Sequence, residues 1–249
     1  MAMQKLPTNI LELERKVELR QQLLSKEELI SLSANLSQPR NLADTLIPVS
    51  TKPLNYILSK ASAESFPNLC SAALLEPSEF NLVPKLKSQY LYPVIGNWPI
   101  IDEYEVWEAR ALELDAVILP SSLLEYTKLQ WMIEVCREAG IDGLVSIKNA
   151  AELGHALKTD AKYLIIDGAE VDARWASLQL KRFGRGRQVI LSLDEPTRLL
   201  IGNMRSIGYN CFHLNTTRAL SPDLVDELSV VTRRRSPLER SAPLQRFWR

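Results

Sequence analysis

The fold is decided by the stretch Pro93-Val94-Ile95-Gly96-Asn97-Trp98-Pro99-Ile100-Ile101-Asp102-Glu103-Tyr104-Glu105-Val106-Trp107-Glu108-Ala109-Arg110. Its first part is a short apolar run, which is typical of a parallel strand buried on both faces. The part that follows mixes apolar with charged residues, and we expect a helix over 103–112. This order of elements predicts a strand–helix unit, which is the building block of a parallel sheet with crossover helices.

The same unit recurs along most of the chain. We expect strands at Tyr56–Ser59, Cys70–Leu75, Tyr92–Asn97, Ala116–Leu119, Gly143–Ile147, Tyr163–Asp167, Gln188–Ser192 and Cys211–Leu214. Helices are expected near Leu82–Ser88, Glu103–Leu112, Leu123–Ala139, Ala150–Thr159, Ala173–Phe183, Glu195–Ile207 and Asp223–Val230. Eight apolar strands that alternate with helices predict an α/β fold, a (β/α)8 TIM barrel.

Three parts are expected along the chain: a helical extension over 1–47, the barrel over 48–231 and an irregular basic tail over 232–249. Leucines recur at roughly helical spacing over 10–35, and residues 41–46 fit one further turn. Only about ten residues separate the first two strands, whereas a parallel crossover needs about a dozen or more. Unless a strand is misassigned, we expect the first barrel helix to be missing and this side of the barrel to be irregular and open to a partner.

Composition excludes few functions but does restrict them. The chain of 249 residues carries 30 Lys+Arg and 30 Asp+Glu, so its overall charge predicts no nucleic-acid partner. Residues 232–249 hold six Arg and one Glu, a balance of +5, which leaves −5 on residues 1–231. The three cysteines are widely spaced, as in proteins of a reducing compartment. No apolar run approaches the roughly 20 residues that span a bilayer. We therefore expect a cytoplasmic protein without a transmembrane segment.

The end of the opening stretch, I-I-D-E-Y-E-V-x-E-A-R, closely resembles a segment of indole-3-glycerol-phosphate synthase, which there reads P-V-L-R-K-D-F-I-I-D-x-Y-Q-V-x-E-A-R. Similar motifs follow the family's order at 55–64, 71–80, 115–119, 143–148 and 149–157. Residues 40–46 resemble a faded R-D-F-x-x-A-L motif, which in the family ends a leading helical segment. The resemblance covers most of residues 10–230 and implies a TIM barrel of the ribulose-phosphate-binding type.

The resemblance also implies where the family's chemistry would lie. That family closes an indole ring on a carboxyphenylamino-deoxyribulose phosphate, using a lysine acid, a carboxylate base and backbone amides that hold the phosphate. The lysine falls on Asn97 and a strand-five glutamate falls on Ser146. The family's N-N-R-D-L and S-E-S-G-I become residues 167–171 and 192–196, and Asn215 replaces a glycine. We therefore expect no catalytic residue of the family reaction, no cofactor and no metal.

Polar residues remain at the predicted strand tips, and two interpretations of them stay open. These residues are Lys60, Asn97, Ser146, Lys148, Asp167, Asp194, Asn215 and Thr216. In the first interpretation they are solvated or mutually paired, and the barrel is a pseudoenzyme that acts as a binding, scaffolding or regulatory subunit through protein–protein contacts. In the second they form a new site in a divergent enzyme, either a carbon–carbon lyase of tryptophan biosynthesis or a protein with a changed phosphate-ligand activity.

Aromatic residues raise two further expectations. Trp98, at the third strand tip, either plugs the former substrate pocket or buries a loop against the barrel. The tail residues Arg233, Arg234, Arg235, Phe247 and Trp248 are types that anchor protein interfaces, and they also suit an anionic surface. We expect them to bind a protein partner or larger assembly, the alternative being a solvated terminus. His155 and His213 are expected to be surface or packing residues rather than metal ligands.

Overall fold

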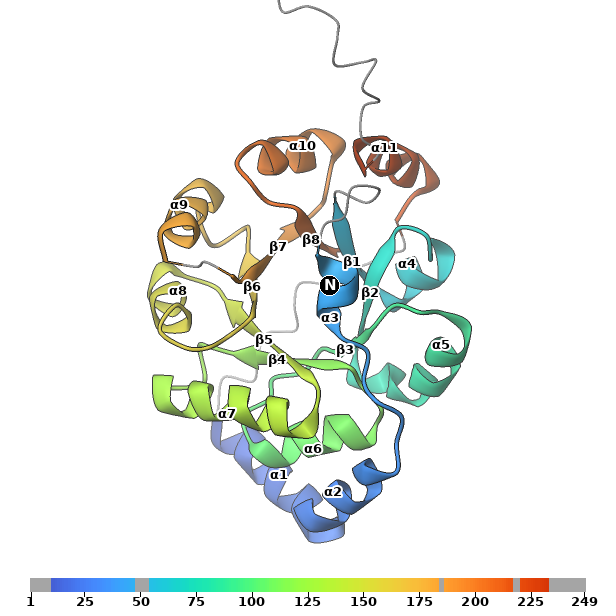
Figure 1. Ribbon diagram of the computed structural model, residues 1–249, viewed down its shortest axis with the longest axis vertical. Coiled ribbons are helices and arrows are strands. Elements are labelled where there is room, and N and C mark those ends of the chain that lie inside the picture. Colours follow the sequence, from blue (N-terminus) through green and yellow to red (C-terminus); the bar gives the residue numbers. More distant parts are fainter. Residues whose placement is uncertain (1–9, 48–53, 184–185, 217–219, 233–249) are drawn as a thin grey trace, which may run out of the picture.

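The computed structural model describes residues 10–47, 54–183, 186–216 and 220–232. Eight parallel strands close into a barrel in sequence order, with each strand paired to its two neighbours and β1 paired to β8 (Figure 1). The strands are β1 (Asn55–Ser59), β2 (Cys70–Leu75), β3 (Val94–Gly96), β4 (Ala116–Pro120), β5 (Asp142–Ile147), β6 (Tyr163–Asp167), β7 (Gln188–Asp194) and β8 (Cys211–Asn215). The predicted TIM barrel is confirmed.

Helices surround the barrel (Figure 1). Those that follow the strands are α4 (Lys60–Ser65), the 3-10 helix η1 (Pro77–Leu82) with α5 (Val83–Gln89), α6 (Glu103–Ala111), α7 (Tyr126–Ala139), α8 (Ala150–Ala156), α9 (Ala173–Phe183), α10 (Arg198–Ser206) and α11 (Pro222–Thr232). The N-terminal segment contributes α1 (Ile10–Leu23), α2 (Lys26–Ala34) and α3 (Leu42–Leu46). The helices that follow the strands form the outer layer typical of this fold.

Strand register divides the core into two parts. Because successive side chains of a strand point to opposite faces, every second residue faces the barrel interior. The inward residues of the lower barrel form one buried cluster: Ile57, Ala72, Ile95, Ala116, Ile118, Leu144, Tyr163, Ile165, Ile190 and Cys211. The residues between them along the strands, such as Leu58, Val117 and Leu164, belong to a second cluster shared with the surrounding helices.

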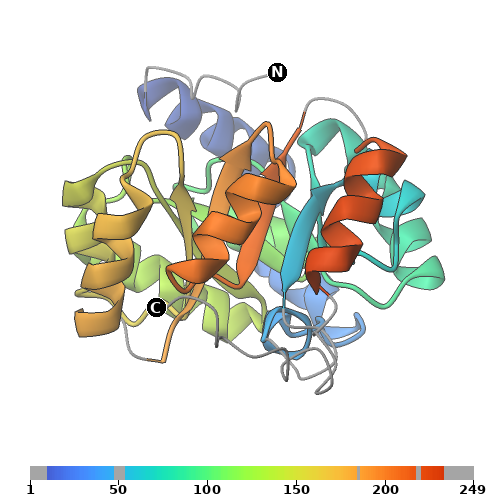
Figure 2. The same ribbon diagram turned by 90° about the horizontal axis from the view of Figure 1, so that it is seen from above.

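The short helix α3 closes the end of the barrel at which the strands begin. Its Leu42 and Leu46 are fully buried and belong to the inner cluster. The Leu42 amide donates to Asp142 Oδ2 at the start of β5 (2.9 Å), and Asn55 Nδ2 donates to the Leu46 carbonyl at the start of β1 (2.8 Å). Figure 1, which looks down the barrel, shows α3 across its centre, and Figure 2 gives the perpendicular view. The faded family motif at 40–46 therefore forms a plug.

The other two N-terminal helices pack outside α6. Val17 of α1 and Leu29 of α2 form a small cluster with Tyr104 of α6. Arg20 also donates to the buried carboxylate of Glu105 (2.7 Å). The expected single helical region over 10–35 is interrupted, because Ser25 accepts from the Glu28 amide and starts α2 with a capping box. The serine supplies an N-cap where the leucine spacing alone suggests continuity.

The expectation of a missing first helix is wrong. Helix α4 follows β1 directly and spans six residues. It is short enough to fit the connection, and its Ser62 and Ala63 are buried. β1 pairs with β2 beyond it, so this side of the barrel is closed rather than open, although the register shifts between Tyr56 and Ile57 as the expected irregularity implies. A single short helix that starts directly after the last residue of β1 is enough for the crossover, although the number of residues suggested that no helix would fit.

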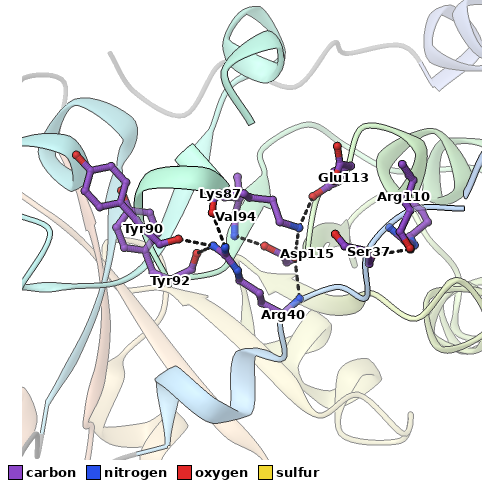
Figure 3. Close-up of polar contacts among 10 residues, drawn as sticks. Ser37, Arg40, Lys87, Tyr90, Tyr92, Val94, Arg110, Glu113 and Asp115 are labelled. Carbon is purple, nitrogen blue, oxygen red and sulfur yellow. Dashed lines mark hydrogen bonds and ion pairs between the residues drawn. The ribbon is translucent and has the colours of Figure 1, made fainter. Parts of the chain in front are cut away.

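A buried carboxylate ties the N-terminal segment to the barrel (Figure 3). Asp115 is 0% exposed and accepts hydrogen bonds from the backbone amides of Arg40 (2.8 Å) and Val94 (2.8 Å). It also forms an ion pair with Lys87 Nζ (2.7 Å). The Arg40 guanidinium in turn donates to the carbonyls of Lys87 (2.7 Å) and Tyr92 (2.9 Å). One carboxylate thus holds the approach to α3, helix α5 and the starts of two strands together.

Replacing this carboxylate is expected to destabilise the whole barrel. Asp115→Asn leaves the Lys87 ammonium, whose side chain is only 10% exposed, without a counter-charge. Loss of one partner of a buried ion pair typically costs about 3–5 kcal/mol, and we expect the free energy of unfolding in urea to fall by about 3 kcal/mol. Asp44→Asn, an exposed change within α3, is the matched control and should stay within about 0.5 kcal/mol of wild type. Equal effects of the two changes would contradict this role for Asp115.

Candidate functional site at the barrel mouth

A cavity of about 640 Å³ opens at the end of the barrel where the strands finish. Below it the inward positions are apolar, with Leu74, Ile118 and Ile165 forming part of its lining. Towards the strand ends the inward positions become polar, as at Ser146 on β5 and Ser192 on β7. This end of a TIM barrel is where the fold places its ligand and catalytic groups. The cavity is therefore the candidate functional site.

Seven of the eight residues predicted at the mouth line this cavity. They are Lys60, Asn97, Ser146, Lys148, Asp167, Asn215 and Thr216. The eighth, Asp194, is exposed and lies outside the lining, but its Oδ1 accepts a hydrogen bond from Asn215 Nδ2 (2.6 Å). The order of the strands and the alternation of their side chains thus bring together residues at the ends of β1, β3, β5, β6 and β8.

Several of these polar groups are held by neighbours on the same loop or on the adjacent strand end. Lys60 forms an ion pair with Glu64, one turn later in α4 (3.1 Å). Asn97 Nδ2 donates to Glu76 Oε1 at the end of β2 (2.7 Å). Asp167 Oδ1 accepts from the Ala169 amide (3.0 Å). These short-range contacts fix the rim without forming an acid–base pair across the cavity.

Lys148 differs from the other charged residues of the lining. Its backbone amide is fixed by Glu152 Oε2 at the start of α8 (2.7 Å). Within the described ranges, no hydrogen bond or ion pair engages its ammonium group. Glu152 is also held by Asn149 Nδ2 (2.6 Å), so the turn that carries Lys148 is well anchored. The structure thus places one uncompensated positive charge on an ordered turn at the mouth.

Among the lining residues that were not predicted candidates, Ser192 and His213 form a polar pair. Ser192 Oγ and His213 Nδ1 form a hydrogen bond of 2.9 Å between β7 and β8. Burial lowers the pKa of His213 to about 4, and the charge of Asp194 offsets a part of this effect. The imidazole is therefore neutral at pH 7. Both residues could have been found from the alternation of side chains along their strands. Ser192 and His213 each lie two positions after an inward apolar residue, Ile190 on β7 and Cys211 on β8, so they also point inwards.

Trp98 does not plug the mouth, so that interpretation is wrong. Its ring packs against Phe80 of η1, with centroids 5.0 Å apart, and a β-carbon at Gly96 would clash with it. Gly96 alternates with the inward-facing Ile95, so the indole covers the outer side of β3. The ring contributes to the core shared with the helices, and the cavity lining does not include it. The alternative expectation, a loop buried against the barrel, describes Trp98 correctly.

Other predicted features lie beyond the site. The tail candidates Arg233, Arg234, Arg235, Phe247 and Trp248 are outside the described residues. Within the described ranges, no three His, Cys, Asp or Glu side chains gather as a metal site would require. No helix in the described part of the chain is long and apolar enough to cross a membrane. The mouth thus remains the site on which function can be argued.

The neutral histidine predicts a pH dependence of stability. Its folded pKa of about 4 lies below the ordinary value of about 6.5, so the unfolded chain binds the proton more readily. The stability that neutral His213 preserves is complete above about pH 6.5 and is lost as the pH falls towards 4, on the order of 2 kcal/mol by pH 5. Urea unfolding at pH 7 and pH 5 should show a smaller loss for His213→Gln than for wild type. His155→Gln, an exposed control, should lose as much as wild type; the same loss in all three proteins would contradict the assignment.

Comparison with known proteins agrees with this architecture. Residues 74–170 match the family model for indole-3-glycerol phosphate synthase. A synthase from Polynucleobacter asymbioticus is 26% identical over 159 residues, which cover 62% of this chain and 56% of the relative. One from Chlorobium chlorochromatii is 28% identical over 157 residues, which cover 53% of this chain and 61% of the relative. The chain therefore spans little more than half the length of these relatives.

Solved structures support the fold alone at their low identities. The 3-hexulose-6-phosphate synthase of Salmonella typhimurium superposes with a TM-score of 0.59 at 14% identity, covering 72% of this chain and 98% of that one. A chain of the tryptophan synthase α2β2 complex of Pyrococcus furiosus gives 0.53 at 11% identity, covering 66% and 87%. The closed barrel and the match over residues 74–170 together show a TIM barrel that is similar to indole-3-glycerol phosphate synthases.

Proposed function

We propose that this barrel no longer performs the synthase reaction and serves as a non-catalytic binding or regulatory subunit. The observation that carries the proposal is the identity of two residues at the mouth. Asn97 and Ser146 line the cavity at the positions where the family resemblance places a lysine acid and a carboxylate base. The frame of the enzyme is retained around a site that lacks its proton-transfer groups.

The chemistry of these two side chains supports the proposal. An amide cannot donate a proton as an ammonium group does, and the Asn97 amide already donates a hydrogen bond to Glu76. A serine hydroxyl cannot accept a proton as a carboxylate does. Each acid–base group typically contributes about 10²–10⁴ to the rate, so loss of both removes most of the expected acceleration.

The end of the cavity near β7 and β8 also disfavours the family's phosphate. The Asp194 carboxylate lies there, hydrogen-bonded to Asn215, where the resemblance implies backbone amides that bind an anion. Glu195 adds a second exposed carboxylate, and Pro196 has no amide hydrogen to donate. A phosphate dianion would therefore meet the negative charge of these two carboxylates.

A second candidate is favoured by the open cavity. A volume of about 640 Å³ lies within the range of small-molecule sites, and Trp98 does not fill it. This observation supports a barrel that still binds a small molecule, either as a ligand-binding subunit or as a divergent enzyme. A carbon–carbon lyase of tryptophan biosynthesis or a changed phosphate-ligand activity belongs to this second candidate.

Genetic complementation tests the first candidate. Expressed in a strain that lacks the synthase, the wild-type chain is expected not to restore growth without tryptophan, because no acid–base pair remains at the mouth. The synthase from Chlorobium chlorochromatii serves as the positive control, with expression of both proteins verified by immunoblot. Growth that depends on Lys60 and Asp167 would overturn the proposal in favour of the divergent enzyme.

We further propose that the basic tail recruits a protein partner or larger assembly in the cytoplasm. Six arginines with Phe247 and Trp248 within residues 232–249 combine positive charge with interface aromatics. The three cysteines are buried, and their wide spacing along the sequence suits a reducing compartment. Affinity purification with and without residues 232–249 should give different partner sets. Unchanged sets would exclude the tail, and recovery only with anionic vesicles would indicate a membrane surface instead.

A further inference from the structure

We propose that the barrel mouth binds a free α-amino acid with an apolar side chain, its carboxylate on Lys148 and its ammonium group on Asp167. The inference rests on the proposed loss of the synthase reaction, since it assigns the retained cavity to a different class of ligand. Three features of the mouth carry it: a neighbouring pair of opposite charges, a neutral polar row and an apolar floor.

The opposite charges lie on adjacent strand ends. Residues Ser146 and Ile147 of β5 pair with Ile165 and Ile166 of β6. Lys148 directly follows the end of β5, and Asp167 is the last residue of β6. Both line the cavity, yet their charged groups lie more than 4.0 Å apart and form no ion pair. Each is thus available to a group of opposite charge. A zwitterion offers a carboxylate and an ammonium group separated by one carbon, which suits two charges on neighbouring strands.

The charge of the lining favours such a ligand over a phosphate ester. Lys60 and Lys148 contribute two positive charges, whereas Glu76, Glu79 and Asp167 contribute three negative charges, a balance of −1. The Lys60 charge is already compensated by Glu64. A dianion would therefore find one available cation in a negative surrounding. An amino acid adds no net charge and places each of its charges beside the opposite one.

Two neutral polar side chains lie beside Asp167 and extend across the mouth. Asp167 pairs with Ser192, and Ser192 pairs with His213, so three inward polar side chains lie side by side on β6, β7 and β8. Asp167 Oδ1 accepts a hydrogen bond from the Ala169 amide, and no other hydrogen bond of the Asp167 side chain is found in the described part of the chain. The second oxygen is thus left for a donor, and an ammonium group carries three.

The floor suits an apolar side chain. Leu74, Ile118 and Ile165 line the cavity below the charged pair. Burying a leucine- or phenylalanine-sized group against them typically contributes on the order of a tenfold to hundredfold gain in affinity. A polar rim above an apolar floor is the usual composition of a small-molecule site, and it orients the amino acid with its side chain inwards.

Calorimetric titration of the full chain with matched probes tests the assignment. The probes share one ring: L-phenylalanine, 3-phenylpropanoate without the ammonium group, phenethylamine without the carboxylate, and phenyl phosphate. L-Phenylalanine should bind saturably and at least tenfold more tightly than either truncated probe, and phenyl phosphate should bind least. L-Leucine provides a second side chain that fits the same floor.

Charge variants provide the second half of the test. Lys148→Met should weaken L-phenylalanine at least tenfold and leave phenethylamine unchanged, whereas Asp167→Asn should weaken L-phenylalanine and leave 3-phenylpropanoate unchanged. Lys158→Met, an exposed lysine on the surface, is the control and should match wild type. Circular dichroism verifies folding, and the wild-type probe series alone decides the outcome if a variant misfolds.

Three outcomes would overturn the assignment: no saturable binding of either amino acid, tighter binding of phenyl phosphate, or equal binding by the variants. These outcomes are independent of synthase turnover, which is measured separately. Turnover with amino-acid binding would defeat only the proposed loss of reaction. Absence of both would defeat only the ligand assignment.

Discussion

Closure of the eight-stranded sheet is the constraint on which the rest of the structure depends. A closed parallel barrel sends every second side chain of each strand inwards, so the register of eight short segments fixes one common interior. At one end that interior is apolar and is completed by Leu42 and Leu46 from outside the barrel. At the other end the same inward positions carry serine, asparagine, aspartate and histidine and face a cavity.

The two ends of the barrel therefore have different roles: the plugged end stabilises the fold, and the mouth holds the candidate site. Asp115 and its partners lie where strands begin, and they join the plug, helix α5 and the sheet. The mouth lies at the opposite end, and its polar groups bond to neighbours on the same loop or on the adjacent strand end. Substitutions at the mouth therefore leave the plugged end intact. A barrel can in this way keep its frame while the residues required for one reaction are replaced.

Much of this organisation could be predicted from the sequence, because local apolar runs and strand order determine it. The strand expected over residues 163–167 was found with those bounds, and the strand-tip argument placed Lys148 and Asp167 at one mouth. Contacts between distant segments could not be predicted. Nothing local to residues 40–46 indicates that they enter the barrel, and nothing local to Trp98 indicates that its ring packs against Phe80. Helix α4 was not predicted because the crossover was judged by its length alone. His213 was not predicted to line the cavity because the alternation of inward and outward side chains along its strand was not considered.

The central claim is that the frame has been kept while the synthase chemistry has been lost. Its most direct test is a steady-state assay of the purified full chain with the carboxyphenylamino-deoxyribulose phosphate substrate, monitored by formation of the indole product. The claim predicts no product above the buffer control at any enzyme concentration. Product that increases in proportion to enzyme, and that is lost when Lys148 and Asp167 are replaced, would contradict it.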